Sequence, residues 1–147
     1  MNSQYKSRLS DLISKISPKK YGKKDNVNVD WIKNSENQYS IELPENYKWF
    51  LLEYDFIILW GETTKTVFPP DFQEYSDQDI FNYYRINDSK NKLVFLVTEE
   101  LEEYYFKIVD NKAHDEVYFY SYLDESENLV SNDFISFLIQ EIPKNYF

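Results

Sequence analysis

The sequence predicts an α+β fold in which N-terminal helices and one C-terminal helix pack on an antiparallel β-sheet meander, with a mixed sheet as the alternative. Two segments, residues 3–16 and 43–54, carry apolar side chains at helical spacing. Three later segments, 92–97, 104–109 and 117–122, are rich in β-branched and aromatic residues and are joined by short connections. Helices before and after a run of strands are typical of the α+β class.

Composition limits the kind of protein that this can be. A chain of 147 residues is expected to form a single domain, 1–147, with a core of its own. The absence of cysteine excludes disulfides, thiolate zinc sites and cysteine nucleophiles. The longest apolar run, Phe56–Trp60, falls far short of the roughly 20 residues that span a bilayer. We therefore expect a soluble, cytoplasmic protein that makes no membrane contact.

Charge is distributed unevenly along the chain. Residues 1–24 carry a net charge of +6 and residues 25–147 a net charge of −16, which together give the total of −10. Because residues 25–147 are this acidic, they repel phosphate backbones, and no direct nucleic acid ligand is expected. A basic protein is the favoured partner. The alternative interpretation is that the acids only keep the protein soluble.

The first helix, residues 3–16, is predicted from four apolar residues on one face and from Ser17-Pro18 at its end: Leu9, Leu12, Ile13 and Ile16. Residues 18–26 contain proline, glycine and four lysines without periodicity, which predicts an exposed basic linker. Asp30 is the predicted cap of a second short helix.

The segment LPENYKWFLLEY, residues 43–54, predicts the next helix. Pro44 suits a first helical turn because its missing N–H has no partner there. Tyr47, Phe50, Leu51 and Tyr54 share one face, which predicts a buried face. A β-hairpin is expected to follow, with strands at 56–60 and 65–68 around a Gly61–Thr64 turn. A short helix is expected within residues 77–85.

The C-terminal half is predicted to form the meander and the last helix. Alternation along 104–109 places Tyr104, Phe106 and Ile108 on one face of the sheet, and Tyr105, Lys107 and Val109 on the other. An amphipathic helix capped by Ser131 is expected to cover the apolar face. Its core residues are Phe134, Phe137, Leu138 and Ile142.

Motifs for catalysis and cofactor binding are missing from this sequence. The only histidine, His114, lies in the NKAHDE turn, where a hydrated surface histidine is expected rather than a catalytic or metal-binding one. The two glycines cannot supply a phosphate-binding loop, and DNKAHDE lacks the spacing of a calcium loop. Among 26 acidic residues no glycosidase-like pair can be singled out. We therefore predict no catalytic residues, no cofactor and no metal.

Acidic residues gather in two of the predicted connections. TEELEE, residues 98–103, joins the first two meander strands, and DESE, residues 124–127, follows the third. In an up-and-down meander both connections lie at the same end of the sheet, where they could dock a basic partner beside nearby tyrosines. The alternative is two solvated turns. The candidate partner-binding residues are Glu99, Glu100, Glu102, Glu103, Asp124, Glu125, Glu127, Tyr105 and Tyr122.

Residues 30–142 resemble the SUKH superfamily (Smi/Knr-like) domain. Its opening pattern is matched by Ile32, Glu36, Tyr39 and Ile41, followed by a sharper signature of five residues: Leu43, Pro44, Tyr47, Phe50 and Leu51. A meander and a final Phe-rich helix, NDFISFLIQEI, follow in the family's order. The sequence departs from the family at Asp55-Phe56, where Asn-Gly or Gly-Gly is usual, and at the EELEE loop, where a Gly-Asp turn is common.

The resemblance implies a binding module without catalysis. Bacterial single-domain members are mostly immunity proteins of polymorphic toxin systems, so the expected partner is a cognate toxin domain with a basic surface, often a nuclease. The protein is expected to be a monomer or a weak dimer. Two alternatives remain, which are a regulatory scaffold module of the same family and a small carboxylate-dependent hydrolase.

Overall fold

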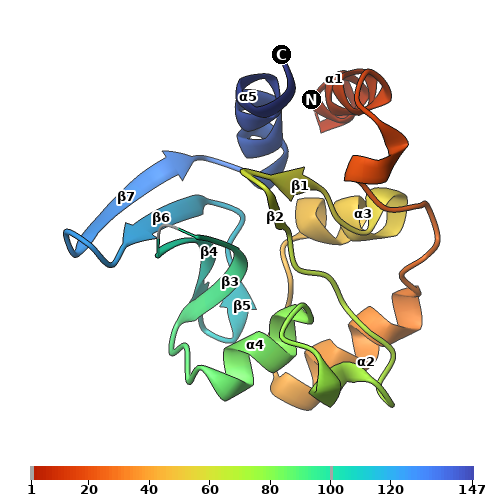
Figure 1. Cartoon of the computed structure of the whole chain (residues 1–147). Coiled ribbons are helices and arrows are strands. Elements are labelled where there is room, and N and C mark those ends of the chain that lie inside the picture. Colours follow the sequence, from red (N-terminus) through yellow and green to blue (C-terminus); the bar gives the residue numbers. More distant parts are fainter. Residues whose placement is uncertain (1, 100) are drawn as a thin grey trace.

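The computed structural model describes residues 2–99 and 101–147, which form five α-helices and two antiparallel sheets, with the main sheet at one edge of the molecule (Figure 1). None of the described helices is long and apolar enough to cross a membrane. Two short 3₁₀ helices, Pro18–Lys20 and Gln73–Tyr75, lie in the connections. The α-helices are α1 (Asn2–Ser14), α2 (Val29–Tyr39), α3 (Glu45–Tyr54), α4 (Ile80–Ile86) and α5 (Phe134–Tyr146).

The main sheet has the strand order β3-β4-β6-β7, and β5 pairs with the far end of β4. A separate small hairpin joins β1 and β2. Every ladder is antiparallel, so the predicted α+β class and the antiparallel meander are confirmed. The strands are β1 (Ile58–Leu59), β2 (Glu62–Thr63), β3 (Lys92–Thr98), β4 (Glu102–Val109), β5 (Lys112–Ala113), β6 (Val117–Ser121) and β7 (Ser126–Ser131).

An aromatic cluster joins α3, the sheet and α5. The ring of Tyr47 lies 5.1 Å from that of Phe134, 5.3 Å from that of Phe106 and 6.4 Å from that of Phe95, measured between ring centroids. All four side chains are fully buried. The Tyr47 hydroxyl donates a 2.7 Å hydrogen bond to the carbonyl oxygen of Lys65. Edge-to-face pairs of this kind add stabilisation beyond the area that they bury.

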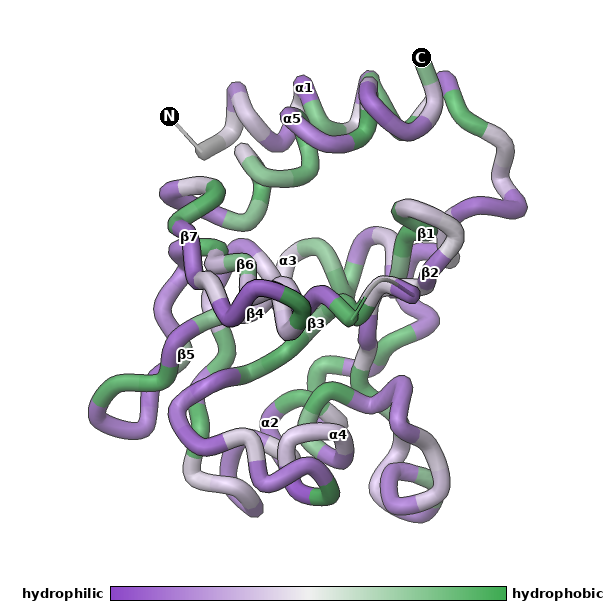
Figure 2. The backbone as a smooth tube through the Cα atoms, turned by 60° about the vertical axis from the view of Figure 1, so that its left-hand side comes forward, coloured by the Kyte–Doolittle hydropathy of each residue, from purple (hydrophilic) through white to green (hydrophobic). Residues whose placement is uncertain are grey.

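The predicted buried face of α3 is confirmed for Tyr47, Phe50 and Leu51, which have no exposed surface, whereas Tyr54 at the end of the helix is only half-buried. Next to α3, α1 and α5 lie side by side in both views (Figures 1 and 2). Leu9 and Ile13 of α1 are buried in the same core. The first and last helices therefore support one another although they are distant in sequence.

The segment predicted as an exposed linker, residues 18–26, is fixed to the end of α3. Gly22 donates its N–H to the carbonyl oxygen of Phe56 at 3.0 Å. A Cβ atom on Gly22 would lie 2.5 Å from the Tyr54 oxygen and 2.6 Å from the Asp55 Cβ, so only glycine permits this approach. The four lysines are exposed, as expected, but the backbone is held in place.

Two predicted helix caps are wrong. The cap of α2 is Asn28, whose side chain accepts from the N–H of Asp30 at 2.7 Å, so Asp30 lies inside the first turn. The cap of α5 is Asp133, which accepts from the N–H of Ser136 at 2.7 Å. Ser131 cannot serve there because it is the last residue of β7.

The predicted hairpin is correct in place but wrong in register. The turn consists of Trp60 and Gly61, both with positive φ (52° and 77°), and Glu62–Thr63 is the second strand. A two-residue turn with two positive φ angles matches the twist of the flanking strands. Residues 65–68 form no strand, although the N–H of Lys65 donates to the Phe95 oxygen at 2.7 Å.

Strand β7 was not predicted from the sequence. Its residues, SENLVS, are mostly polar and exposed or half-buried because it is the last strand of the sheet. An edge strand with polar side chains has no strong alternation for a pattern search to detect. The residues predicted as a turn, 124–127, therefore contribute Ser126 and Glu127 to a strand.

Changing Tyr47 to Phe should lower the free energy of unfolding by about 1–2 kcal/mol, because the Lys65 carbonyl loses its buried donor. Urea unfolding checks this. The matched control is Tyr75→Phe, since Tyr75 is 78% exposed and should change stability by less than about 0.5 kcal/mol. Equal losses in the two variants would show that the Tyr47 hydroxyl contributes no more than a surface hydroxyl.

Burial raises the pKa of the Tyr47 hydroxyl well above its ordinary value, and the charges of Asp79 and Asp55 add to this. The folded state therefore keeps a proton that the unfolded chain loses above about pH 10, and stability should fall as the pH rises past that point. In Tyr47→Phe this fall should be shallower by up to about 1.4 kcal/mol per pH unit. Urea midpoints at increasing pH measure it, and parallel profiles for both proteins would contradict it.

Candidate protein-binding surface

The β3–β4 and β6–β7 connections lie at one end of the main sheet. Glu102 pairs with Ser121 across β4 and β6, and Ser121 pairs with Ser126 across β6 and β7. The N–H of Tyr122 donates to the carbonyl oxygen of Leu101 at 3.1 Å, which ties one turn to the other. The acids of both turns therefore share this end, which we call the acidic end.

The candidate acids differ in how accessible they are. Glu99, Asp124 and Glu125 are exposed. Glu102 is half-buried and accepts from the Thr98 hydroxyl at 3.3 Å. Glu100 lies outside the described residues. Of the acids that the structure describes in the first turn, Glu99 is thus the one most open to a partner.

Glu103 and Tyr122 contact each other. Glu103 is only 7% exposed, and its carboxylate accepts from the Tyr122 hydroxyl at 2.8 Å. Burial, followed by this hydrogen bond, raises the pKa of Tyr122. The Tyr122 ring remains half exposed. Glu103 therefore positions the tyrosine, and the tyrosine ring is the part that a partner can reach.

Tyr105 and Glu127 connect β4 to β7 across β6. The buried Tyr105 donates its hydroxyl to the Glu127 carboxylate, which also accepts from Lys107 Nζ at 3.0 Å. The hydrogen bond from Tyr105 is the largest cause of a lowered pKa at Glu127, and burial is the largest cause of a raised pKa at Tyr105. These two predicted binding residues are thus engaged within the protein.

Lysines of the protein itself cover the outer face of the sheet beside them. Lys92 Nζ lies 4.2 Å from the ring centroid of Tyr120 and 4.9 Å from that of Tyr105. Lys107 Nζ lies 4.0 Å from the ring centroid of Tyr118. Cation–π contacts of this kind occupy the tyrosine faces. The aromatic rings of the outer face are therefore covered by the protein's own lysines, whereas Glu99 and Glu125 at the acidic end are exposed.

Two exposed leucines at the acidic end were not predicted as binding residues. Leu101 is 58% exposed and Leu123 is 75% exposed. Leu101 also has a φ of 60°, a conformation that costs a residue with a Cβ roughly 1–2 kcal/mol. The available signal was a single apolar residue inside each polar connection, in TEELEE and before DESE.

Trp60, at the tip of the β1–β2 hairpin, borders the same end. Its ring stacks on Tyr104 with centroids 5.2 Å apart and an interplanar angle of 7°, and it is 40% exposed. Together with Glu99 and Glu102 it lines a hollow of about 210 Å³. The acidic end therefore presents apolar side chains beside carboxylates.

This arrangement has features of a protein-binding surface. A centre made of Leu101, Tyr122 and Leu123, with charged residues at its edge, has the anatomy of a protein interface. In the part of the chain that the structure describes, no three histidine, aspartate or glutamate side chains are grouped to hold a metal ion. The acidic end is thus the candidate functional surface of the fold.

Comparison with known proteins agrees with the fold. A search of curated proteins finds no match. The family model SUKH_6, described as SMI1-KNR4 cell-wall, matches residues 29–138, which run from the start of α2 into α5 and include the α3 signature and both acidic turns. This match covers most of the chain, and the protein therefore belongs to the SUKH (SMI1-KNR4) family.

Proposed function

We propose that this protein is a non-catalytic immunity protein that binds a cognate toxin domain of a polymorphic toxin system and neutralises it. Membership of the SUKH family is consistent with such a role. The net charge of −16 over residues 25–147 complements a basic domain, such as a nuclease that binds nucleic acid. The toxin is neutralised when the acidic end occupies its basic surface and blocks access to it.

Leu101 is the observation that supports a binding role for the acidic end. A bulky side chain at positive φ is a genuine outlier for an L-amino acid. The Leu101 side chain is exposed, so burial of apolar surface does not offset the cost of this backbone conformation. Local strain of this kind gathers at binding sites, where the surrounding structure holds it. If Leu101 were buried against a partner, its side chain would gain apolar contacts that it does not make in the isolated protein.

The leucines and the acids would contribute differently to binding. Apolar anchors such as Leu101 and Leu123 become desolvated in the complex and chiefly slow dissociation. Exposed carboxylates such as Glu99 and Glu125 attract a basic surface over several ångströms and chiefly speed association. The two effects can be separated by kinetics at different salt concentrations.

The description of the matching family model favours a second candidate, a regulatory module that binds a cellular protein. The same acidic end would serve this function, since its chemistry selects a basic partner but not that partner's activity. The two candidate functions make different predictions for the neighbouring gene: the immunity function expects it to encode a toxin domain, and the regulatory function does not.

Co-expression tests the immunity function. If the neighbouring gene encodes a toxin domain, this protein should co-purify with it and restore growth to cells that express it. A complex that forms without protecting the cells, or a toxin that is equally lethal with and without this protein, would contradict the proposal. Protection is expected without any change in the chemical state of the toxin, because the function needs no reaction.

Reversing two exposed charges, Glu99→Lys with Glu125→Lys, should slow association with the toxin domain roughly tenfold at low salt and much less at high salt. Stopped-flow or surface-based kinetics at two salt concentrations measure this. Glu103 is left unchanged because it is buried against Tyr122.

The matched control is Asp71→Lys with Glu74→Lys, two exposed acids in the loop before α4. This double variant changes the net charge by the same amount at a distance from the acidic end. It should slow association far less than the first pair. Equal slowing by both pairs would mean that total charge, and not the acidic end, steers the partner.

Changing Leu101 to Asn should stabilise the free protein by about 0.5–1 kcal/mol, because asparagine tolerates positive φ, and should weaken binding about tenfold. Leu123→Asn is the control. Leu123 is exposed at the same end without a positive φ, so this change should weaken binding without a gain in stability. Unfolding curves and binding titrations distinguish the two. A Leu101→Asn variant that binds as tightly as the wild type would remove Leu101 from the interface.

A further inference from the structure

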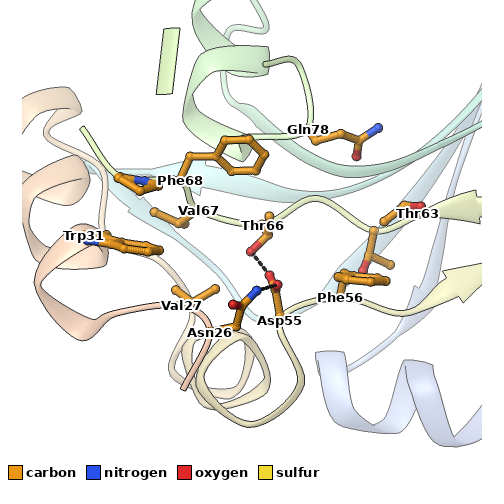
Figure 3. Close-up of a pocket in the computed structure, with 12 residues that line it drawn as sticks. Asn26, Val27, Trp31, Asp55, Phe56, Thr63, Thr66, Val67, Phe68 and Gln78 are labelled. Carbon is orange, nitrogen blue, oxygen red and sulfur yellow. Dashed lines mark hydrogen bonds between the residues drawn. The ribbon is translucent and has the colours of Figure 1, made fainter. Parts of the chain in front are cut away.

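A second cavity, lined by other residues than those of the acidic end, lies between α2, the C-terminal end of α3 and the segment after β2 (Figure 3). Its volume is about 380 Å³, which is within the range of sites for small molecules. Most of its walls are apolar, from Val27, Trp31, Phe56, Val67, Phe68 and Pro69. Its lining residues come from separate parts of the chain, so no sequence motif predicts the cavity.

Asp55 places a carboxylate in this apolar cavity. It follows the last residue of α3 and has a φ of 67°, at one of the positions where the family usually has an Asn-Gly or Gly-Gly pair. Asn26 Nδ2 donates to one carboxylate oxygen at 2.6 Å, and the Thr66 hydroxyl donates to the other. Asp55 is 5% exposed. Figure 3 shows these three residues grouped among the aromatic rings.

No cation balances the Asp55 carboxylate among the described residues. The ion pairs that they form involve other acids, and both hydrogen-bond donors to Asp55 are neutral. A carboxylate has about four acceptor positions, and two of those on Asp55 are used. A buried charge without a counter-ion is costly, so a cation that enters the cavity gains a strong interaction.

Gln78 adds a second unsatisfied acceptor. It lines the same cavity, and its Oε1 atom is buried without a hydrogen-bond donor in the described structure. The unused acceptor positions of the Asp55 carboxylate and the Gln78 amide oxygen, which has no donor, select a ligand that donates hydrogen bonds. Aromatic walls from Trp31 and Phe68 favour a cation further, because ring faces attract positive charge.

We propose that this cavity binds a small organic cation, a primary ammonium group on an aryl or alkyl stem. The ammonium donates to Asp55, and the stem packs against Trp31, Val67 and Phe68. An anion would be repelled by Asp55, and a sugar would leave its hydroxyls unpaired against the apolar walls. The site does not depend on the immunity function, since it is lined by other residues than those of the acidic end.

An NMR titration with phenethylammonium chloride tests this site. Its addition should shift the signals of the Asn26 side-chain amide, the Trp31 indole and the Thr66 backbone amide. The neutral analogue 2-phenylethanol should bind at least about tenfold more weakly, because it lacks the charge that pairs with Asp55. Equal affinities of the two probes, an absence of binding, or shifts confined to the acidic end would each overturn the proposal.

The Asp55→Asn variant tests how much the negative charge of Asp55 contributes to ligand binding. Asparagine accepts positive φ and keeps an acceptor for Thr66, so the fold should be retained. This variant should bind phenethylammonium about tenfold more weakly and 2-phenylethanol unchanged. The matched control is Asp88→Asn, an exposed aspartate with a φ of 49°, which should bind both probes as the wild type does. Unchanged binding by Asp55→Asn would overturn the proposal, and if that variant unfolds, the comparison of the two probes on the wild type still decides.

Discussion

The contact of Tyr47 with Phe95, Phe106 and Phe134 is the interaction on which the rest of the structure depends. It is the place where α3, the central strands and α5 meet, and the Tyr47 hydroxyl also fixes the backbone at Lys65. This cluster positions both the main sheet and the segment around Lys65. The sheet extends away from it to the acidic end, and the segment around Lys65 leads into the cavity beside Asp55 (Figure 1).

Sequence patterns predicted those parts of the fold in which local preference and burial agree. The α3 signature has apolar residues at helical spacing and is buried on that face, and β3, β4 and β6 have strand-forming residues with buried side chains among them. Strand β7 escaped prediction because an edge strand needs no apolar alternation. The fixed backbone of the linker at residues 18–26 was not predicted, because it depends on the contact of Gly22 with the end of α3, which is distant in sequence.

The candidate surfaces were predictable to different degrees for a related reason. Antiparallel connectivity alone placed the two acidic turns together. Pattern could not show that Glu103 and Glu127 are engaged with tyrosines, or that Leu101 is strained and exposed, because both depend on cross-strand neighbours. The cavity at Asp55 is assembled from segments far apart in the sequence, so composition and spacing carried no sign of it.

We propose that the acidic end, with its leucines, is where this member of the SUKH family meets its partner. Hydrogen exchange on the complex with the toxin domain encoded next to the gene tests it most directly. Amides at residues 99–102 and 122–126 should become protected on binding, while those around Asp55 keep their exchange rates. Protection confined to the Asp55 cavity or to the outer face of the sheet, with the acidic turns unchanged, would contradict it.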